Sequence, residues 1–161
     1  SEMCIRDRSN PDIIFHLAAQ AIVKSSYEHP VRTWHSNLIG TVNVLECLRF
    51  VKKKTTAVII TSDKAYKNIE TKKGYKENDV LKGDDPYGAS KSSADIAISS
   101  YFYSYFSKKN SKVLISIARA GNVIGGGDWS PNRIVTDCVN SWSKNKKAIK
   151  SQEIMIPRNS K

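Results

Sequence analysis

The sequence alternates short apolar runs with longer segments of helical periodicity, and this alternation limits the fold more than any other feature. Three apolar runs rich in β-branched residues are the predicted strands, at residues 13–17, 57–61 and 113–118. Such continuous runs are typical of strands that are buried on both faces of a parallel sheet. Three helical segments follow the runs, at residues 31–53, 86–106 and 132–143. This order predicts an α/β fold with a doubly wound, Rossmann-like parallel sheet.

The helical segments carry recognisable signals at their ends. The first has one apolar stripe with steps of three and four residues, formed by Leu38, Val42, Leu45 and Leu48. Three lysines at residues 52–54 are expected to close it, because cations stabilise the carboxyl end of a helix. Asp85 and Pro86 suit the N-cap and the first position of the second helix. The polar residues 67–85 before them predict a surface loop.

Composition places the chain among globular proteins. Its 161 residues suffice for one domain of ordinary size, with 40% hydrophobic and 25% charged residues. No apolar run approaches the roughly 18 residues that a membrane-spanning helix needs, so we expect a cytoplasmic protein without a membrane partner. Cys4, Cys47 and Cys138 are widely spaced and belong to no cluster of cysteines and histidines. Reduced thiols and no metal site are therefore expected.

The net charge of +11 raises the question of nucleic-acid binding. The lysines fall in short groups, mostly where helices should end, at residues 52–54, 72–73, 108–109 and 146–147. Such groups are typical of solvated helix ends, so we expect no nucleic-acid partner. A positive field also suits an anionic substrate such as a nucleotide diphosphate. A basic nucleic-acid module remains an alternative, and its affinity would fall steeply with salt.

Polar residues follow two of the predicted strands, at the edge where open parallel sheets bind their ligands. Ser62, Asp63 and Lys64 come directly after the second run, and Asn122 comes after the third. An aspartate beside a lysine is more often a surface ion pair. At a strand end the same two groups can serve as proton donor and acceptor, which is the reading we favour.

Tyr87 and Lys91 are four residues apart and share one face of the second helix. A tyrosine hydroxyl titrates at about pH 10, and a lysine ammonium one turn away stabilises the phenolate that accepts a proton. This spacing alone is usually surface packing, but its place downstream of two buried strands favours a proton-transfer pair. His16 is interpreted as a core histidine at a strand end. The glycine-rich residues 121–127 lack a phosphate-loop ending and predict a crossover toward a second lobe.

Five segments, in this order and spacing, carry a resemblance: residues 16–20 (His-Leu-Ala-Ala-Gln), 37–41 (Asn-Leu-Ile-Gly-Thr), 61–66 (Thr-Ser-Asp-Lys-Ala-Tyr), 87–91 (Tyr-Gly-Ala-Ser-Lys) and 119–125 (Arg-Ala-Gly-Asn-Val-Ile-Gly). Together they resemble the extended short-chain dehydrogenase/reductases, the family of NAD-dependent epimerases and dehydratases of sugar nucleotides. Within it, Ser62-Asp63-Lys64 and the residues 125–133 are similar to the CDP-glucose 4,6-dehydratases. The dTDP-glucose enzymes have Thr-Asp-Glu after this strand.

The resemblance implies a lyase of deoxysugar biosynthesis that uses NAD and converts CDP-glucose to CDP-4-dehydro-6-deoxy-glucose. It implies that Tyr87, aided by Lys91, takes the proton of the sugar 4-hydroxyl while hydride passes from carbon 4 to NAD. Asp63 then acts as the acid in the loss of water, and Lys64 stands where the family's glutamate base sits. Ser62 is expected to hydrogen-bond the 4-oxygen.

The same comparison implies the binding residues. The cofactor-binding set is Leu17, Ala18, Ala19, Asn37, Tyr87 and Lys91. The substrate-binding set is Ser26, Asn122 and Arg133. A guanidinium suits a diphosphate because it can bind two of its oxygens at once.

The chain also departs from the family pattern. It has no glycine-rich turn before His16, where the family seats the cofactor pyrophosphate at a helix N-terminus. We therefore expect residues 1–9 to be extraneous and residues 10–161 to be a central fragment, incomplete at both ends, with a substrate lobe starting at about residue 125. Alone it should bind NAD poorly and be inactive, and the full-length enzyme should be a homo-oligomer. Alternatives are another sugar-nucleotide epimerase, a dTDP-glucose dehydratase, or a noncatalytic NAD-binding protein on the same fold.

Overall fold

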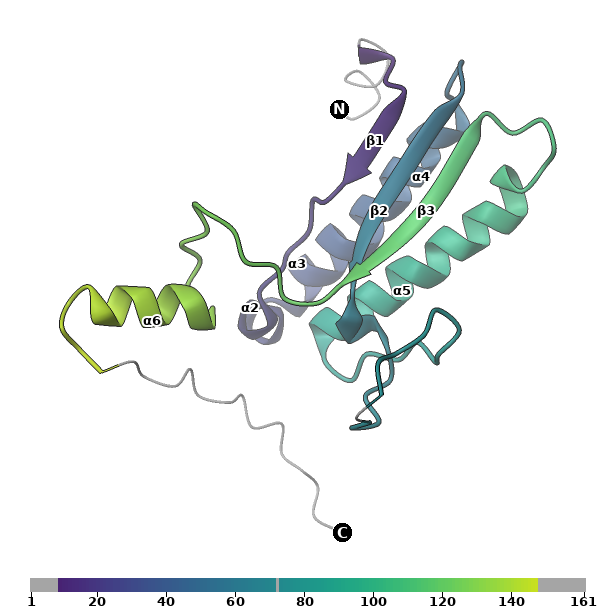
Figure 1. The fold of residues 1–161 in the computed structure, drawn as a ribbon. Coiled ribbons are helices and arrows are strands. Elements are labelled where there is room, and N and C mark those ends of the chain that lie inside the picture. Colours follow the sequence, from purple (N-terminus) through teal and green to yellow (C-terminus); the bar gives the residue numbers. More distant parts are fainter. Residues whose placement is uncertain (1–8, 72, 148–161) are drawn as a thin grey trace. The chain divides into compact units, whose positions relative to one another are not determined.

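In the residues that the computed structural model describes, 9–71 and 73–147, the chain forms a three-stranded parallel sheet. The strands are β1 (Ile13–His16), β2 (Thr55–Ser62) and β3 (Val113–Ala120), and β2 lies in the centre (Figure 1). The register pairs Ile13 with Thr56, and Thr55 with Val113. The three predicted strands and the Rossmann-like α/β class are confirmed.

Helices connect the strands. Between β1 and β2 lie α2 (Val23–Glu28), α3 (Pro30–Trp34), the π-helix η1 (His35–Ile39) and α4 (Gly40–Arg49). After β2 come the 3-10 turn η2 (Asp63–Ala65), α5 (Pro86–Tyr101) and the π-helix η3 (Phe102–Phe106), and α6 (Ile134–Trp142) follows β3. The sequence analysis missed α2, which is only six residues long and has no side-chain cap. It also extended the first helix too far, since α4 ends at Arg49 and not at residue 53.

The start of α5 follows from local sequence, as predicted. Pro86 occupies the first turn, and the Asp85 carboxylate accepts hydrogen bonds from the backbone N–H groups of Tyr87 and Gly88 at 2.9 and 3.0 Å. This cap satisfies two donors that would otherwise lack an intrahelical partner. The helical path continues through η3 to Phe106, which confirms the predicted end.

The core lies between one face of the sheet and the helices α4 and α5, which Figure 1 shows on the same side of the strands. Its buried side chains come from all of these elements: Leu45, Leu48, Ala57, Ile59, Ile98, Phe106 and Val113. Right-handed crossovers that move across a sheet in one direction place their helices on one face. The order β1-β2-β3 therefore explains why both crossovers contribute to a single core.

The opposite face of the sheet is open in the described residues. Ile13 and Phe15 of β1 are 56% and 64% exposed, and Leu114 of β3 is 67% exposed. The prediction that these strands are buried on both faces is therefore wrong for this chain. Alternate residues of each strand point to opposite faces, and α4 and α5 cover only one of them.

The chain divides into two compact units, with the boundary between Gly121 and Asn122. The first contains the sheet and its crossover helices. The second contains α6, within which Thr136 is buried and donates its hydroxyl to the carbonyl of Asp128 at 2.9 Å. α6 lies inside the predicted span 132–143. Among the described helices, none has the length and apolar character required to cross a bilayer.

Candidate active site

The carboxyl end of β2 carries the predicted Ser-Asp-Lys set on a tight turn. Ser62 is 5% exposed, and its hydroxyl donates to Asp63 Oδ1 at 3.0 Å and accepts from the backbone N–H of Lys64 at 3.2 Å. The serine thereby caps η2. Asp63 and Lys64 are both exposed to solvent. The turn thus presents a carboxylate and an amine at the edge where ligands bind to parallel sheets.

Helix α5 brings Lys91 to the same end of β2. Its Nζ donates to the carbonyl of Ile60 at 3.3 Å, two residues before Ser62. The side chain is buried, and this burial lowers the pKa of Lys91, an effect that the negative charge of Asp95 opposes. Tyr87 lies one turn earlier on α5 and is 9% exposed. The structure therefore brings the Lys91 amine to the strand end that carries Ser62 and Asp63.

Backbone groups of α5 and η2 pack directly on each other. A Cβ atom at Gly88 would lie 2.8 Å from the carbonyl oxygen of Lys64, and a Cβ atom at Gly83 would lie 1.9 Å from the carbonyl carbon of Gly88. No side chain fits in either place without a backbone shift. The absence of side chains here is what lets α5 approach the turn closely.

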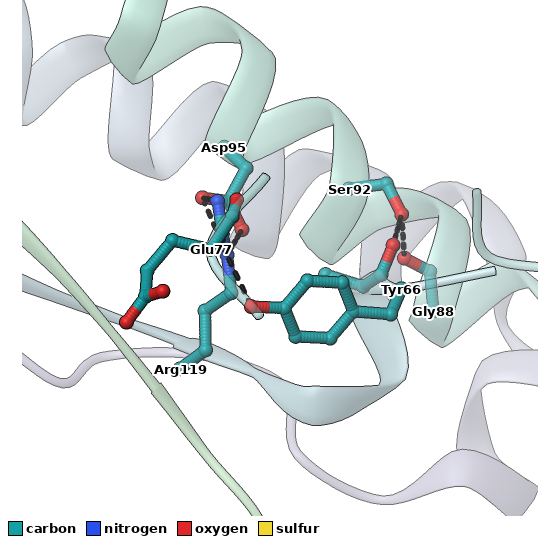
Figure 2. A network of polar contacts seen from close by, with 7 residues as sticks. Tyr66, Glu77, Gly88, Ser92, Asp95 and Arg119 are labelled. Carbon is teal, nitrogen blue, oxygen red and sulfur yellow. Dashed lines mark hydrogen bonds and ion pairs between the residues drawn. The ribbon is translucent and has the colours of Figure 1, made fainter. Parts of the chain in front are cut away.

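Hydrogen bonds of Ser92 stabilise this packing, and they could not be predicted from the sequence. The buried Ser92 hydroxyl lies 2.7 Å from the carbonyl oxygen of Ala65 and 3.0 Å from that of Gly88, and it accepts from the N–H of Gly83 at 2.9 Å. Figure 2 shows the serine above the two carbonyl groups. No local pattern indicated this contact, because Ala65 is 27 residues away from Ser92 along the chain.

Asn37 joins the segment after β1 to α5. It is 1% exposed, its Oδ1 accepts from the N–H of Gln20 at 2.8 Å, and its Nδ2 donates to the Gln20 carbonyl at 3.0 Å and to Ser90 Oγ at 2.9 Å. The side chain of Gln20 in turn donates to Thr33 at 3.1 Å. Asn37, predicted to line the cofactor, therefore holds the neighbouring backbone in place, and the sequence analysis missed Gln20 as its partner.

Three more of the predicted cofactor residues lie on that segment and are exposed: Leu17, Ala18 and Ala19. A pocket lies beside them, lined by His16, Ala18, Ala19, Gln20, Arg32, Ser36, Gly40 and Val44. Small side chains at three of these positions leave the backbone accessible to a ligand. His16 Nε2 lies 3.3 Å from Thr41 Oγ1, so this ring has a hydrogen-bond partner from α4.

The predicted substrate residues are divided between the two units. Ser26 is fully buried in α2, and its hydroxyl donates to the carbonyl of Val23 at 2.6 Å. Asn122 and Arg133 belong to the second unit, where Arg133 Nε lies 3.0 Å from Asp128 Oδ2. Hydrogen bonds from Ser130 and, to a smaller extent, the charge of Arg133 lower the pKa of Asp128. Desolvation acts in the opposite direction and is outweighed. The roles of these three residues remain predictions.

Comparison with known proteins places these features in a family. The model of the family described as GDP-mannose 4,6 dehydratase matches residues 4–147. The CDP-glucose 4,6-dehydratase of Salmonella typhimurium is 43% identical over 142 residues, which are 86% of this chain and 40% of that protein. The dTDP-D-glucose 4,6-dehydratase of Dictyostelium discoideum is 28% identical over 153 residues, 89% of this chain and 33% of its own.

Solved structures share the fold. RMD from Pseudomonas aeruginosa, complexed with NADPH, superposes with a TM-score of 0.64 at 28% identity, over 78% of this chain and 41% of that one. A UDP-glucuronic acid 4-epimerase from Bacillus cereus, bound to UDP-glucuronic acid and NAD, gives a TM-score of 0.75 at 19% identity over 91% and 43%. At that identity the likeness concerns the fold alone. The chain spans less than half the length of each of these relatives.

Proposed function

The chain belongs to the GDP-mannose 4,6 dehydratase family, and on that premise we propose that the complete protein is an NAD-dependent lyase that dehydrates CDP-glucose. The product is CDP-4-dehydro-6-deoxy-glucose. The 43% identity to a CDP-glucose 4,6-dehydratase supports this substrate over other nucleotide sugars. The assembled state of the complete protein is proposed to be a homo-oligomer.

One observation carries the proposal: a buried lysine amine lies at the strand end that also bears an exposed carboxylate and amine. Lys91 Nζ contacts the carbonyl of Ile60, and Asp63 follows Ser62 at the end of the same strand. A 4,6-dehydration needs a proton acceptor for the 4-hydroxyl and an acid and a base for the loss of water. We assign these roles to Tyr87, one turn before Lys91 on α5, and to Asp63 and Lys64.

In the proposed reaction Tyr87 accepts the proton of the sugar 4-hydroxyl. Tyr87 does so as the phenolate and becomes a neutral phenol. Lys91 stabilises the phenolate before the transfer, and its charge acts strongly because the amine is buried and poorly screened by solvent. A bound NAD would supply the hydride acceptor that oxidation at carbon 4 needs and the hydride source that reduction at carbon 6 needs. The resulting 4-keto group acidifies the proton on carbon 5.

Asp63 and Lys64 then carry out the elimination. Asp63 donates a proton to the departing 6-hydroxyl, and Lys64 takes the proton from carbon 5. A lysine amine can do so only when it is uncharged, which desolvation by the bound sugar favours. Ser62 is proposed to hydrogen-bond the 4-oxygen, for which its hydroxyl must turn from the Asp63 carboxylate that it contacts at 3.0 Å.

The residues after β1 fit a dinucleotide cofactor. A pocket lies there, and the small residues Ala18, Ala19, Ser36 and Gly40 form part of its lining. Asn37 holds this segment through both of its amide atoms, so it is proposed to shape the cofactor site. Ser26, Asn122 and Arg133 are proposed to face the sugar nucleotide. For Arg133 to bind a diphosphate, its guanidinium must exchange the Asp128 carboxylate for the ligand.

The test is the product that the complete protein forms. CDP-glucose, dTDP-glucose and UDP-glucose are incubated separately with the protein and NAD, and products are analysed by mass spectrometry. We expect CDP-glucose to lose the mass of one water molecule, and to do so faster than the other two. A product of unchanged mass with inverted stereochemistry would identify an epimerase instead. Loss of product formation in Lys64→Ala supports the dehydratase, because an epimerase needs no base at this position.

A further inference from the structure

Arg119, near the end of β3, is the most heavily engaged side chain of the first unit that the proposed reaction does not use. Its Nε lies 3.3 Å from both carboxylate oxygens of Asp95, and its second terminal nitrogen lies 3.1 Å from Asp95 Oδ1. The other terminal nitrogen donates to the Tyr66 hydroxyl at 2.8 Å and to the Glu77 carbonyl at 3.1 Å. Figure 2 shows the guanidinium between these groups.

Asp95 is the buried half of an ion pair. It is 0% exposed, and the Arg119 side chain is 16% exposed. A buried carboxylate is stable only when a counter-charge and hydrogen bonds replace its lost hydration. Asp95 also lies one turn beyond Lys91 on α5, and its charge acts on that amine. Arg119 therefore ties β3 to the part of α5 that bears the proposed proton-transfer pair.

Tyr66 connects the same guanidinium to the turn that bears the proposed acid and base. It follows η2 directly, and its N–H donates to the carbonyl of Asp63 at 3.1 Å. The residues on either side of Tyr66 are held to the far side of the loop. The N–H of Lys82 donates to the Ala65 carbonyl at 2.9 Å, and the N–H of Lys67 donates to the Val80 carbonyl at 2.7 Å. Tyr66 therefore links the Arg119 guanidinium, through its hydroxyl, to the Asp63 carbonyl, through its N–H.

We propose that Arg119 is a positioning residue that holds the Asp63–Ala65 turn against α5, so that Asp63 and Lys64 face the groups carried by Tyr87 and Lys91. The inference rests on the proposed function for its catalytic consequence. Each nitrogen of the guanidinium is already bonded within the protein. Arg119 acts through other residues and does not touch the substrate.

Tyr66→Phe is the sharpest test, because it removes one hydroxyl and keeps the ring that stacks on Tyr75 at 4.9 Å. In the complete protein we expect kcat for dehydration to fall about fivefold, the effect of one lost hydrogen bond, with KM unchanged. Tyr75→Phe is the matched control, because its hydroxyl contacts only the exposed loop at Ile69 and Asn68. It should keep the wild-type kcat.

Arg119→Met should lower kcat about 100-fold, and Arg119→Lys should restore a part of it by keeping a charge beside Asp95. A purely structural role predicts instead that the folded fraction falls while kcat per folded molecule stays constant. Circular dichroism and thermal unfolding measure that fraction. Folded Arg119→Met and Tyr66→Phe proteins with wild-type kcat would overturn the proposal.

Amide hydrogen exchange separates this inference from the proposed function, since it does not require turnover. In Tyr66→Phe the N–H groups of Tyr66 and Lys82 should exchange about tenfold faster than in the wild type, and in Tyr75→Phe they should not change. Unchanged exchange in Tyr66→Phe refutes the positioning role whatever the activity. Faster exchange in a protein that dehydrates no nucleotide sugar supports the positioning role and refutes the proposed function alone.

Discussion

The two halves of α5 contrast sharply in what they bury. The amino half buries polar groups: Ser90 and Ser92 are 0% and 5% exposed, Lys91 is 6% exposed, and Asp95, just beyond the midpoint of the helix, is 0% exposed. The carboxyl half and the π-helix after it bury Ile98 and Phe106. Buried polar groups are costly unless each is hydrogen-bonded, whereas buried apolar groups stabilise the fold unaided. The amino half, where polar groups are buried at a cost in free energy, packs against the turn after β2. This arrangement points to a function at that turn.

Two tyrosines of α5, one in each half of the helix, also differ in their surroundings. Tyr101, in the carboxyl half, donates its hydroxyl to Glu46 at 2.5 Å, and this hydrogen bond raises the pKa of Tyr101 to about 12. Such a hydroxyl is a poor proton acceptor near neutral pH. Tyr87 lies in the amino half, one turn from the buried amine of Lys91. Position in the helix therefore separates a structural tyrosine from the proposed catalytic one.

The largest expected effect is that of Tyr87→Phe on activity. In the complete protein, loss of the proton acceptor should reduce the rate of product formation about 1,000-fold. The corresponding change in the other half, Tyr101→Phe, should leave the rate within about twofold, because only a contact with Glu46 is lost. Initial rates with CDP-glucose measure both. Equal losses of rate in Tyr87→Phe and Tyr101→Phe would contradict the functional difference between the two halves of α5.

Asp95→Ala should cause the largest loss of stability, about 4 kcal/mol, because the guanidinium of Arg119 then lacks its counter-charge in a buried site. Urea unfolding gives the change in free energy. The double variant with Arg119→Met should recover a large part of the loss, since no unpaired charge then remains. Additive losses in the double variant would show that the two residues act independently.

Ile98→Ala should cost about 3 kcal/mol of stability through the lost burial and the cavity it leaves. Asp95→Ala and Ile98→Ala should differ in their effect on activity, because Ile98 belongs to the apolar core. The molecules that remain folded should keep their kcat. Measured at a temperature where the variant is fully folded, a tenfold lower kcat would contradict this division.

Ser92→Ala should cost about 2 kcal/mol, because the N–H of Gly83 and the carbonyl of Ala65 both lose a partner in a buried place. Ser99 of the same helix is exposed and supplies the matched control. Ser99→Ala should change stability by less than about 0.5 kcal/mol. Thermal unfolding of the two variants compares a buried with an exposed hydroxyl on one helix.

The smallest effect concerns pH. Burial lowers the pKa of Lys91 below its value in the unfolded chain, so the folded state disfavours the charged amine. This cost is fully present below the folded pKa and disappears as pH rises toward the unfolded pKa. The wild type should therefore gain stability relative to Lys91→Met as pH is raised through this window, measured by urea unfolding. A gap that is constant with pH would contradict the assigned shift.

Sequence reasoning succeeded where the cause is local. The Asp85-Pro86 start of α5 lies within one turn of chain, and the three apolar runs needed only their own composition to be identified as strands. It failed where the outcome depends on neighbours. The exposure of Phe15 could not be foreseen, because an apolar run does not show which face a crossover helix will cover.

In the candidate site, too, local sequence identified some residues but could not identify contacts between distant ones. The residues Ser62, Asp63 and Lys64 could be proposed from their place after a strand, and Tyr87 with Lys91 from their spacing on a helix. Gln20 could not be found in this way, because its partner Asn37 is 17 residues away along the chain. Nor could the pairing of Asp95 with Arg119, which are 24 residues apart.

The sequence by itself determined the order of elements, the cap of α5 and the candidate groups, because periodicity, capping and turn chemistry act within a few residues. Only the tertiary structure decided that Lys91 reaches the carbonyl of Ile60 and that Arg119 joins Tyr66 to Asp95. Contacts between distant segments depend on how sheet and helices pack. In that packing, each buried charge or amide must find its partner wherever the fold has placed one.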